Sequence, residues 1–265
     1  MNYHQIAEII KEEDANFEKI NIGTSNDIFH SQKSLIRIKK ENETDKDFNT
    51  PQNEINLYKS LNNLDCIPKI LFFDKEGNKA EEYIKGTLFN KEEKKDIFLL
   101  ANSIKKLHAS PIFDNTPNFR IEKRLAKYKN GLSLFSTYEK EITKKGINIL
   151  EGSKQVISHN DLWKGNIIIA NEKAYLIDFE FGGVNSYLFD LASFIEENRL
   201  SKENEEYFLS IFFLTDKEKK DIKTLILFLD IFWGYWAYSR YSESKNENFY
   251  IIFEEKRNHF LKKVL

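Results

Sequence analysis

The chain has little of the residues that cross-link, break or loosen a polypeptide. Its 265 residues include one cysteine, four prolines and ten glycines. A single thiol, Cys66, excludes an internal disulfide, and no group of Cys and His residues has the spacing of zinc ligands, so we expect a reducing environment. With 41% hydrophobic and 31% charged residues, the composition also excludes collagen-like, linker-rich and disordered classes. These absences predict an ordered globular protein.

An excess of charge of one sign and a long apolar run are also missing. The 40 basic and 42 acidic residues give a formal net charge of −2, which does not predict nucleic acid or an anionic membrane as a partner. The most apolar segment, residues 225–238, contains Asp230 and is shorter than the roughly 20 residues of a membrane helix. The N-terminus carries Glu and Asp where a signal peptide needs a basic end and an apolar stretch. We therefore expect a cytoplasmic protein with no nucleic-acid partner and no membrane insertion, and its oligomeric state stays open.

The first part of the chain has the pattern of a small α+β lobe. Short apolar runs bounded by turn-forming residues occur at residues 18–22, 27–30, 34–38, 69–74 and 79–84. The first three runs predict an antiparallel meander, and the last two predict a hairpin around a Lys-Glu-Gly-Asn turn. Between them, the apolar spacing after Pro51 predicts a helix that packs behind the strands.

Helical spacing dominates the rest of the chain, with one interruption. β-branched runs at residues 167–169 and 174–177 flank an Asn-Glu-Lys turn and predict a second hairpin. At about 150 residues per domain, the length allows one or two units. We therefore predict an α+β fold with a small β-rich N-terminal lobe, residues 1–84, and a larger, mainly helical C-terminal lobe, residues 85–265.

Polar residues around the second hairpin have the spacing of a phosphoryl-transfer catalytic loop. His159, Asp161 and Asn166 form an H-x-D-x4-N motif, and Asp178 follows within Ile-Asp-Phe. Such reactions need one carboxylate to orient the attacking hydroxyl and take its proton, and an amide oxygen and a second carboxylate to hold Mg²⁺. Asp161, Asn166 and Asp178 supply these groups. The alternative, a helix-capping Asp161 and a turn-forming Asp178, does not account for the combined spacing.

A kinase also needs a cation on the nucleotide phosphates, held by an acid from a neighbouring helix. Arg37 lies in the third predicted strand and Glu54 in the following predicted helix, so they are the candidates for this pair. An ordinary surface ion pair is the alternative, and the downstream loop favours the functional interpretation. The turn that contains Ser25 and Asn26 offers backbone N–H groups to phosphates, or is simply a hairpin turn.

Several segments together resemble one family. SHNDLWKGNI, LIDFEFGGVNSYLFDLA and FWGYWAYSR, with the earlier GTSNDIF, LIRI and AEEYIKG, resemble choline/ethanolamine kinases, including bacterial choline kinases, within the aminoglycoside-phosphotransferase-like superfamily. The resemblance covers roughly residues 20–265. It implies a protein-kinase-like bilobal fold that binds ATP. The catalytic-loop motif is shared across the superfamily, whereas the continuation IDFEF and the segment FWGYW are more particular to choline kinases.

The resemblance also implies roles for individual residues. Asp161 would be the catalytic base, and Asn166 and Asp178 the magnesium ligands. Arg37 and Glu54 would face the phosphates. The segment from Glu82 to Ile84 would be the hinge whose backbone meets adenine, and Asp190 the buried acid that anchors the catalytic loop.

The substrate end can be argued from chemistry as well as likeness. Choline carries a quaternary ammonium without N–H donors, so a site binds this head with aromatic faces and carboxylates. The residues that the resemblance places there are Phe181, Glu197, Trp233, Trp236 and Phe253. Trp233 and Trp236 lie three apart on a helical face, a spacing that also fits ordinary core packing. Phe181 and Phe253 stand where relatives often have Tyr, and the choice between Glu196 and Glu197 depends on the helix phase.

We therefore expect an ATP- and Mg²⁺-dependent choline kinase that forms phosphocholine. The nearest alternatives phosphorylate ethanolamine, thiamine or an aminoglycoside on the same fold. Multiply cationic aminoglycosides would favour several acids, so the aromatic FWGYW segment argues against them. A catalytically silent nucleotide-binding protein is a different class of alternative, and it should lack at least one of the three loop groups, all of which are present.

Overall fold

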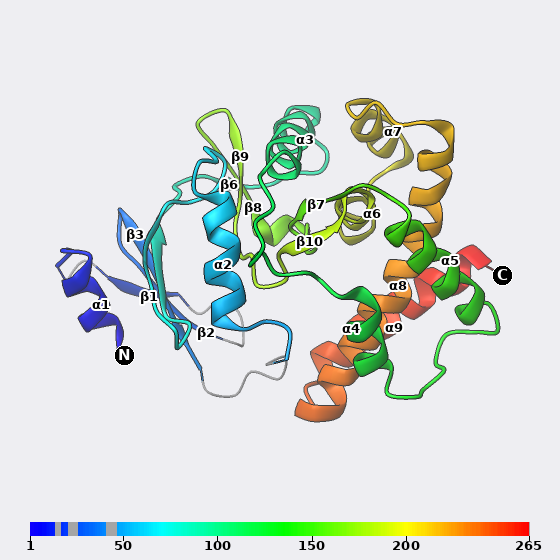
Figure 1. The fold of residues 1–265 in the computed structure, drawn as a ribbon, viewed down its shortest axis with the longest axis horizontal. Coiled ribbons are helices and arrows are strands. Elements are labelled where there is room, and N and C mark those ends of the chain that lie inside the picture. Colours follow the sequence, from blue (N-terminus) through cyan, green and yellow to red (C-terminus); the bar gives the residue numbers. More distant parts are fainter. Residues whose placement is uncertain (14–16, 21–25, 41–46, 265) are drawn as a thin grey trace. The chain divides into compact units, whose positions relative to one another are not determined.

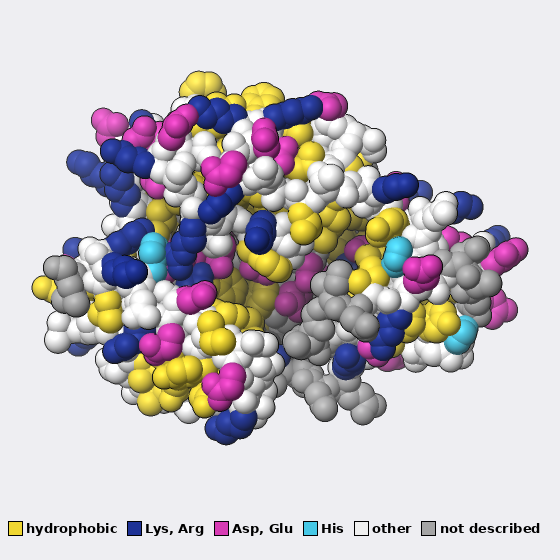
Figure 2. Space-filling model, turned by 180° about the vertical axis from the view of Figure 1, so that it is seen from behind, with side chains coloured by type: hydrophobic (Ala, Val, Ile, Leu, Met, Phe, Trp, Pro, Cys, Tyr) yellow, Lys and Arg dark blue, Asp and Glu magenta, His cyan; other side chains and the backbone are white. Residues whose placement is uncertain are grey.

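A computed structural model describes residues 1–13, 17–20, 26–40 and 47–264. The described chain packs as two compact units, Met1–Pro117 with Lys164–Gly182, and Asn118–Trp163 with Gly183–Leu265. Its N-terminal region is built on antiparallel sheet and its C-terminal region on helices (Figure 1), so the predicted α+β fold class is confirmed. On the face drawn in Figure 2, Lys and Arg side chains are interspersed with Asp and Glu side chains.

The first unit contains a five-stranded antiparallel sheet in the spatial order β1-β2-β3-β5-β4. Its strands are β1 (Glu18–Ile20), β2 (Asn26–His30), β3 (Ser34–Lys39), β4 (Ile70–Phe73) and β5 (Lys79–Glu82). The predicted meander and hairpin are therefore confirmed. The hairpin turn places Gly77 at φ +96°, a left-handed conformation that glycine adopts without the steric penalty of a side chain.

Helices cover this sheet. Helix α1 (Tyr3–Ile9) packs Ile6 and Ala7 against the sheet core. Helix α2 (Pro51–Leu61) begins at Thr50, whose hydroxyl accepts a hydrogen bond from the N–H of Asn53. Proline at the first helical position and a hydroxyl cap before it are typical of a helix start, so the helix predicted after Pro51 is confirmed.

A second sheet of the first unit joins segments that are far apart in the sequence. β6 (Thr87–Leu88), β8 (Ile167–Ala170) and β9 (Lys173–Leu176) form an antiparallel sheet, and α3 (Lys94–His108) packs against β9. The predicted second hairpin is thus confirmed, and it packs with residues that precede it by about 80 positions. The two compact units therefore do not coincide with a division of the chain at residue 84. The predicted lobes, residues 1–84 and residues 85–265, stay a prediction.

The second unit surrounds one long helix. Its elements are α4 (Ile121–Lys129), α5 (Glu139–Glu151), β7 (Gln155–Ser158), β10 (Gly183–Ser186), α6 (Tyr187–Asn198), α7 (Lys202–Ser210), α8 (Asp216–Ser244) and α9 (Glu247–Val264). Helix α8 packs against α4, α5, α6 and α9 (Figure 1), and residues 225–235 of α8 are buried apart from position 227. This apolar segment is therefore a helix buried within the second unit. None of the helices in the described ranges has the length and apolar character that crossing a bilayer requires.

The glycine in the middle of α8 permits a close approach of another segment. A Cβ atom on Gly234 would lie 2.4 Å from the ζ carbon of Phe135. The ring of Phe135 also contacts Tyr235 and Phe253, with ring centroids 5.4 and 6.1 Å apart. Gly234 therefore lets an aromatic layer form against α8 and α9.

Candidate active site

The loop that follows β7 is fastened at its start by Asp190. The two carboxylate oxygens of Asp190 accept hydrogen bonds from the N–H groups of His159, at 3.0 Å, and Asn160, at 2.8 Å. Asp190 is completely buried in the first turn of α6. Asn160 has a φ of +66° and its side-chain oxygen accepts a hydrogen bond from Asn185 at 2.7 Å. The predicted anchoring of this loop by Asp190 is confirmed.

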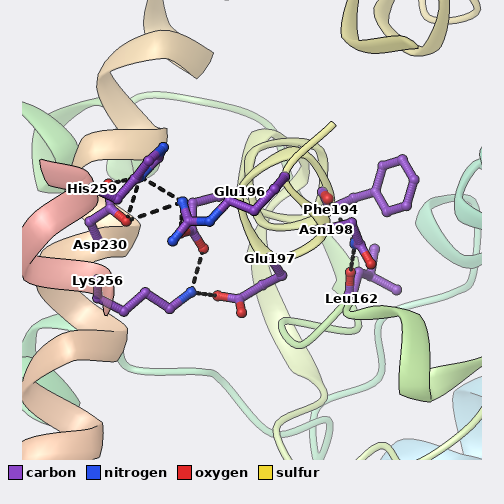
Figure 3. A network of polar contacts seen from close by, with 9 residues as sticks. Leu162, Phe194, Glu196, Glu197, Asn198, Asp230, Lys256 and His259 are labelled. Atoms are coloured by element: carbon purple, nitrogen blue, oxygen red, sulfur yellow. Dashed lines mark hydrogen bonds and ion pairs between the residues drawn. The ribbon is translucent and has the colours of Figure 1, made fainter. Parts of the chain in front are cut away.

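The same helix holds the other end of the loop. The side-chain amide of Asn198, at the end of α6, donates 2.8 Å hydrogen bonds to the carbonyls of Leu162 and Phe194 (Figure 3). Half-buried Asp161 lies between the two fastened positions. The backbone is held on both sides of Asp161, so the position from which its carboxylate extends is fixed. A side chain that is to accept a proton needs such positioning.

The β8–β9 hairpin brings the other two motif residues together. Ile167 pairs with Leu176, and the N–H of Ile177 donates to the carbonyl of Asn166 at 3.0 Å. Asn166 therefore faces the Ile177–Asp178 segment at the end of the hairpin. Asn166 is buried, whereas Asp178 is exposed and has a φ of +61°. One amide oxygen and one carboxylate on facing strand ends fit Mg²⁺, which binds few protein oxygens and keeps several waters.

Arg37 and Glu54 form the predicted pair. Their side chains are buried and lie 2.7 Å apart, between β3 and α2. A second cation, which the sequence analysis missed, is Lys79 of β5. Its ammonium lies 3.4 Å from Glu54, 2.8 Å from Glu81 and 3.1 Å from the hydroxyl of Tyr58. The signal in the sequence was the alternation of Lys79 and Glu81, which places both side chains on the same face of a strand.

This cluster keeps Arg37 and Glu54 ionised. Burial alone would raise the pKa of Glu54, but the charges of Arg37 and Lys79 outweigh burial and lower this pKa to about 2. Burial likewise opposes the charge of Arg37, while Glu54, and next Asp178, raise its pKa above the ordinary value. The structure thus holds a permanent cation in the field of Asp178.

Glu54→Gln is expected to lower the thermal midpoint in a way that depends on pH. The pKa of Glu54 falls from 4.5 to about 2 on folding, so its ionised form contributes stability above pH 4.5 that is lost between pH 4.5 and pH 2. The shift corresponds to about 3 kcal/mol. Melting curves should show a gap between wild type and Glu54→Gln at pH 7 that narrows below pH 4.5. Glu76→Gln, in the exposed turn, is the control. A difference in thermal midpoint between wild type and Glu54→Gln that does not depend on pH would contradict the lowered pKa of Glu54.

The remaining predicted nucleotide contacts lie at strand ends. Asn26 is the first residue of β2 and pairs with Lys39, whereas Ser25 lies outside the described residues. At the end of β5 and directly after it, the N–H groups of Glu82 and Tyr83 donate to the carbonyls of Lys69 and Lys33. Ile84 is buried. The roles of these residues in binding a nucleotide stay predictions.

The two tryptophans of α8 meet each other and one further ring. The rings of Trp233 and Trp236 are 5.7 Å apart and nearly perpendicular, and Phe249 of α9 meets Trp236 in the same way at 5.6 Å. Trp233 is buried and Trp236 half-buried. Phe249 was missed because nothing in its local sequence distinguishes it from other aromatic residues of α9.

The two phenylalanines predicted for the substrate site lie in different units. Phe253 is buried in the second unit, where its ring contacts Phe135, Tyr238 and Tyr250. Phe181 is buried in the closing segment of the first unit. Their contact with a substrate stays a prediction.

The structure defines the phase of the helix that carries the two adjacent acids. The side chain of Glu196 is fully buried and contacts Arg199 at 2.8 Å and Lys256 at 2.7 Å. The side chain of Glu197 is 17% exposed and contacts Lys256 at 2.6 Å. Glu197 is therefore the acid of the two whose side chain reaches solvent.

Comparison with known proteins gives a consistent identification. A family model described as choline/ethanolamine kinase matches residues 17–212. A protein LicA homolog of Metamycoplasma hominis is 33% identical over 160 residues, which cover 57% of this chain and 63% of that relative. This alignment therefore spans less than two thirds of the length of the Metamycoplasma hominis protein. A protein LicA homolog of Mycoplasma capricolum is 26% identical over 253 residues, 93% of this chain and 98% of the relative.

A solved structure shares the fold. The choline kinase LicA from Streptococcus pneumoniae superposes with a TM-score of 0.74 at 18% identity, covering 98% of this chain and 99% of that chain. The predicted kinase-like α+β fold is thus confirmed. Because the family model matches most of the sequence and one relative aligns over nearly all of it, the chain belongs to the choline/ethanolamine kinase family, whose members are phosphotransferases acting on an alcohol.

Proposed function

We propose that this protein is an ATP- and Mg²⁺-dependent choline kinase, which transfers the γ-phosphate of ATP to the hydroxyl of choline. The observation that carries the proposal is that α9, within the second unit, contributes both to an aromatic cluster and to an ion pair with an acid. Trp236 of α8 contacts Trp233 and Phe249, and Lys256, which follows Phe249 on α9, contacts Glu197. Aromatic faces and a carboxylate are the groups that bind a quaternary ammonium. The matched protein from Streptococcus pneumoniae is itself named a choline kinase, which supports the same substrate.

Asp161 is the proposed base of the reaction. Its carboxylate orients the choline hydroxyl, whose oxygen forms a bond to the γ-phosphorus while the bond from that phosphorus to the bridging oxygen of ADP breaks. The hydroxyl proton passes to Asp161 and the products are phosphocholine and ADP. Positioning is the main contribution of the protein, so the hydrogen bonds of Asp190 and Asn198 to the loop support this role.

The nucleotide is proposed to bind through the residues of the first unit. Arg37, held by Glu54, contacts the phosphates, and Ser25 and Asn26 contribute backbone N–H groups to them. The backbone of the hinge from Glu82 to Ile84 meets adenine; because the N–H groups of Glu82 and Tyr83 donate to carbonyls of the protein, we assign this contact to the carbonyl of Glu82 and the backbone of Ile84. Asn166 and Asp178 would hold Mg²⁺, which when bound neutralises charge on the phosphates.

The contacts of Glu197 favour choline over ethanolamine. A primary ammonium brings N–H donors that need acceptors, whereas a quaternary ammonium needs only apolar or aromatic surface and a nearby negative charge. One oxygen of Glu197 is already 2.6 Å from Lys256. Phe181 and Phe253 carry no hydroxyls that could accept further hydrogen bonds. The proposed site therefore favours binding of the quaternary ammonium of choline over the primary ammonium of ethanolamine.

A coupled assay of ADP release tests the function. ATP is supplied with and without Mg²⁺, and choline, ethanolamine, thiamine and kanamycin are each tested as the sole acceptor. We expect turnover that requires Mg²⁺ and is highest with choline. Preference for another acceptor would refute the choline assignment but keep phosphoryl transfer. ATP binding without transfer to any acceptor would refute the enzymatic proposal as a whole.

Trp236→Ala is expected to raise the KM for choline about 10- to 30-fold, with a smaller effect on kcat. The physical reason is the loss of one aromatic face, which contributes about 2 kcal/mol to binding a desolvated cation. Trp236 is half-buried, so this change disturbs the core less than a change of Trp233. Steady-state kinetics at varied choline measures the effect, and Phe213→Ala, at a fully exposed ring, is the control. An unchanged KM for choline would remove Trp236 from the site.

A further inference from the structure

A cluster of charged side chains joins α6, α8 and α9 next to the proposed choline site. Helix α6 and the residue after it contribute Glu196, Glu197 and Arg199, α8 contributes Asp230, and α9 contributes Lys256 and His259 (Figure 3). None of these residues takes part in the proposed transfer step, apart from the contact of Glu197 with the substrate. Glu196, Asp230 and Lys256 of this cluster are buried, and charges are costly to bury unless they are paired.

The cluster does not have the character of a metal site. Glu196, Asp230 and His259 bring ligand atoms within 4.8 Å of one another. However, Arg199 lies 2.8 Å from Glu196 and 2.6 Å from the Nδ1 atom of His259, and Lys256 lies 2.7 Å from Glu196. Arg199 and Lys256 thus already supply positive charge to the two oxygens of Glu196, and Arg199 also lies 3.6 Å from Asp230. The acids are therefore partners of protein cations.

Lys256 is the member that links this buried cluster to the substrate side. Its ammonium bridges Oε2 of Glu196 and Oε1 of Glu197, at 2.7 and 2.6 Å. The side chain of Lys256 is 8% exposed and that of Glu196 is fully buried, whereas that of Glu197 is 17% exposed. Glu196 also contacts Arg199, so the buried pair of Glu196 and Lys256 is held in place. The ammonium of Lys256 in turn holds the carboxylate of Glu197.

The position of Lys256 on α9 places it beside the aromatic residues. Phe249, Phe253 and Lys256 follow one another at spacings of four and three residues, so they lie on the same face of the helix. Phe249 contacts Trp236, and Phe253 packs one turn before Lys256. The residue that holds the acid and the residues that form the aromatic cluster therefore share one helical face.

We propose that Lys256 is a positioning residue for choline: its ammonium fixes Oε1 of Glu197, so that Oε2 meets the ammonium of the substrate. The inference rests on the proposed choline kinase function. Burial and the adjacent Glu196 raise the pKa of Glu197 well above its ordinary value although the charge of Lys256 opposes them, so the loss of Lys256 would favour the protonated form further. Without Lys256, two adjacent carboxylates would share a buried site, and such pairs hold a proton in place of one charge. A protonated Glu197 would attract the ammonium only weakly.

The first test is Lys256→Met, compared with Lys256→Arg. We expect Lys256→Met to raise the KM for choline at least about tenfold, as for the loss of a charge-assisted contact, while kcat and the KM for ATP change less than about threefold. Lys256→Arg keeps the cation and should restore the KM for choline to within about threefold of wild type. Lys262→Met, at an exposed lysine of the same helix, is the matched control. A KM for choline that stays at the wild-type value in Lys256→Met would overturn the inference.

A double-mutant cycle separates positioning from a general structural effect. If Lys256 acts through Glu197, the variant carrying both Glu197→Gln and Lys256→Met has the same KM for choline as Glu197→Gln alone. The double variant lacks the repulsion between two carboxylates, so it keeps the inference testable if Lys256→Met alone fails to fold. Additive increases in KM would overturn the inference.

Wild-type kinetics in the same experiment distinguish the two levels of the proposal. Turnover of choline by wild type together with an unchanged KM in Lys256→Met refutes only the role of Lys256. Absence of choline turnover by wild type refutes the proposed function and this inference with it. A raised KM that Arg rescues, combined with a non-additive cycle, supports both.

Discussion

Asp161→Asn is expected to lower kcat by about 10²- to 10⁴-fold, which is the usual contribution of a positioned general base. The amide has nearly the same size as the carboxylate, but it cannot take the proton of the choline hydroxyl. Because Asp190 and Asn198 hold the loop through backbone groups of other residues, the substitution should leave the fold and the KM for ATP nearly unchanged. Single-turnover measurement of ADP formation at saturating choline reports this loss directly.

Asp114→Asn, in an exposed loop after α3, is the matched control for this change of charge and should retain wild-type kcat. A melting curve of Asp161→Asn confirms that the variant is folded. If Asp161→Asn keeps a kcat within about threefold of wild type, proton transfer to Asp161 contributes little to the barrier, and another group must orient the hydroxyl.

Sequence spacing predicts contacts well where a short segment or consecutive elements fix the geometry. Arg37 and Glu54 form an ion pair as expected, because strand alternation and the helix that follows constrain both side chains. The hairpin of β8 and β9 likewise brings Asn166 opposite Ile177. In both cases the periodicity of the elements and a short connection leave few other arrangements.

Contacts across long separations could not be predicted in this way. Lys79 bonds to Tyr58, 21 positions earlier, and Lys256 bonds to Glu197, 59 positions earlier. Such pairs depend on how helices pack and on their rotation about their own axes, which one sequence does not determine. For the same reason, the choice between Glu196 and Glu197 required the burial of each side chain in the folded unit.

Asp190→Asn is expected to damage both stability and turnover, although Asp190 does not contact the proposed substrates. Both of its carboxylate oxygens accept hydrogen bonds from backbone N–H groups, at His159 and Asn160, in a fully buried position. An asparagine side chain offers one acceptor and one donor, so one of these N–H groups would face an NH₂ group. The loss of one charge-assisted hydrogen bond and an unsatisfied donor corresponds to about 2–4 kcal/mol.

The effect on catalysis follows from the position of Asp161, directly after Asn160 in the chain. A shift of the loop by about 1 Å can lower turnover about 10²-fold when the reacting groups lose alignment. We therefore expect Asp190→Asn to reduce kcat about 10²-fold, with the KM for ATP less affected, in steady-state assays below its lowered thermal midpoint. Asn198→Ala removes two neutral hydrogen bonds, to the carbonyls of Leu162 and Phe194, and should cost about 2 kcal/mol. Equal losses of kcat in Asp190→Asn and Asn198→Ala would show that the charge of Asp190 is not what holds the loop. A larger loss of kcat in Asp190→Asn would show that α6 positions the carboxylate of Asp161 through the start of the loop.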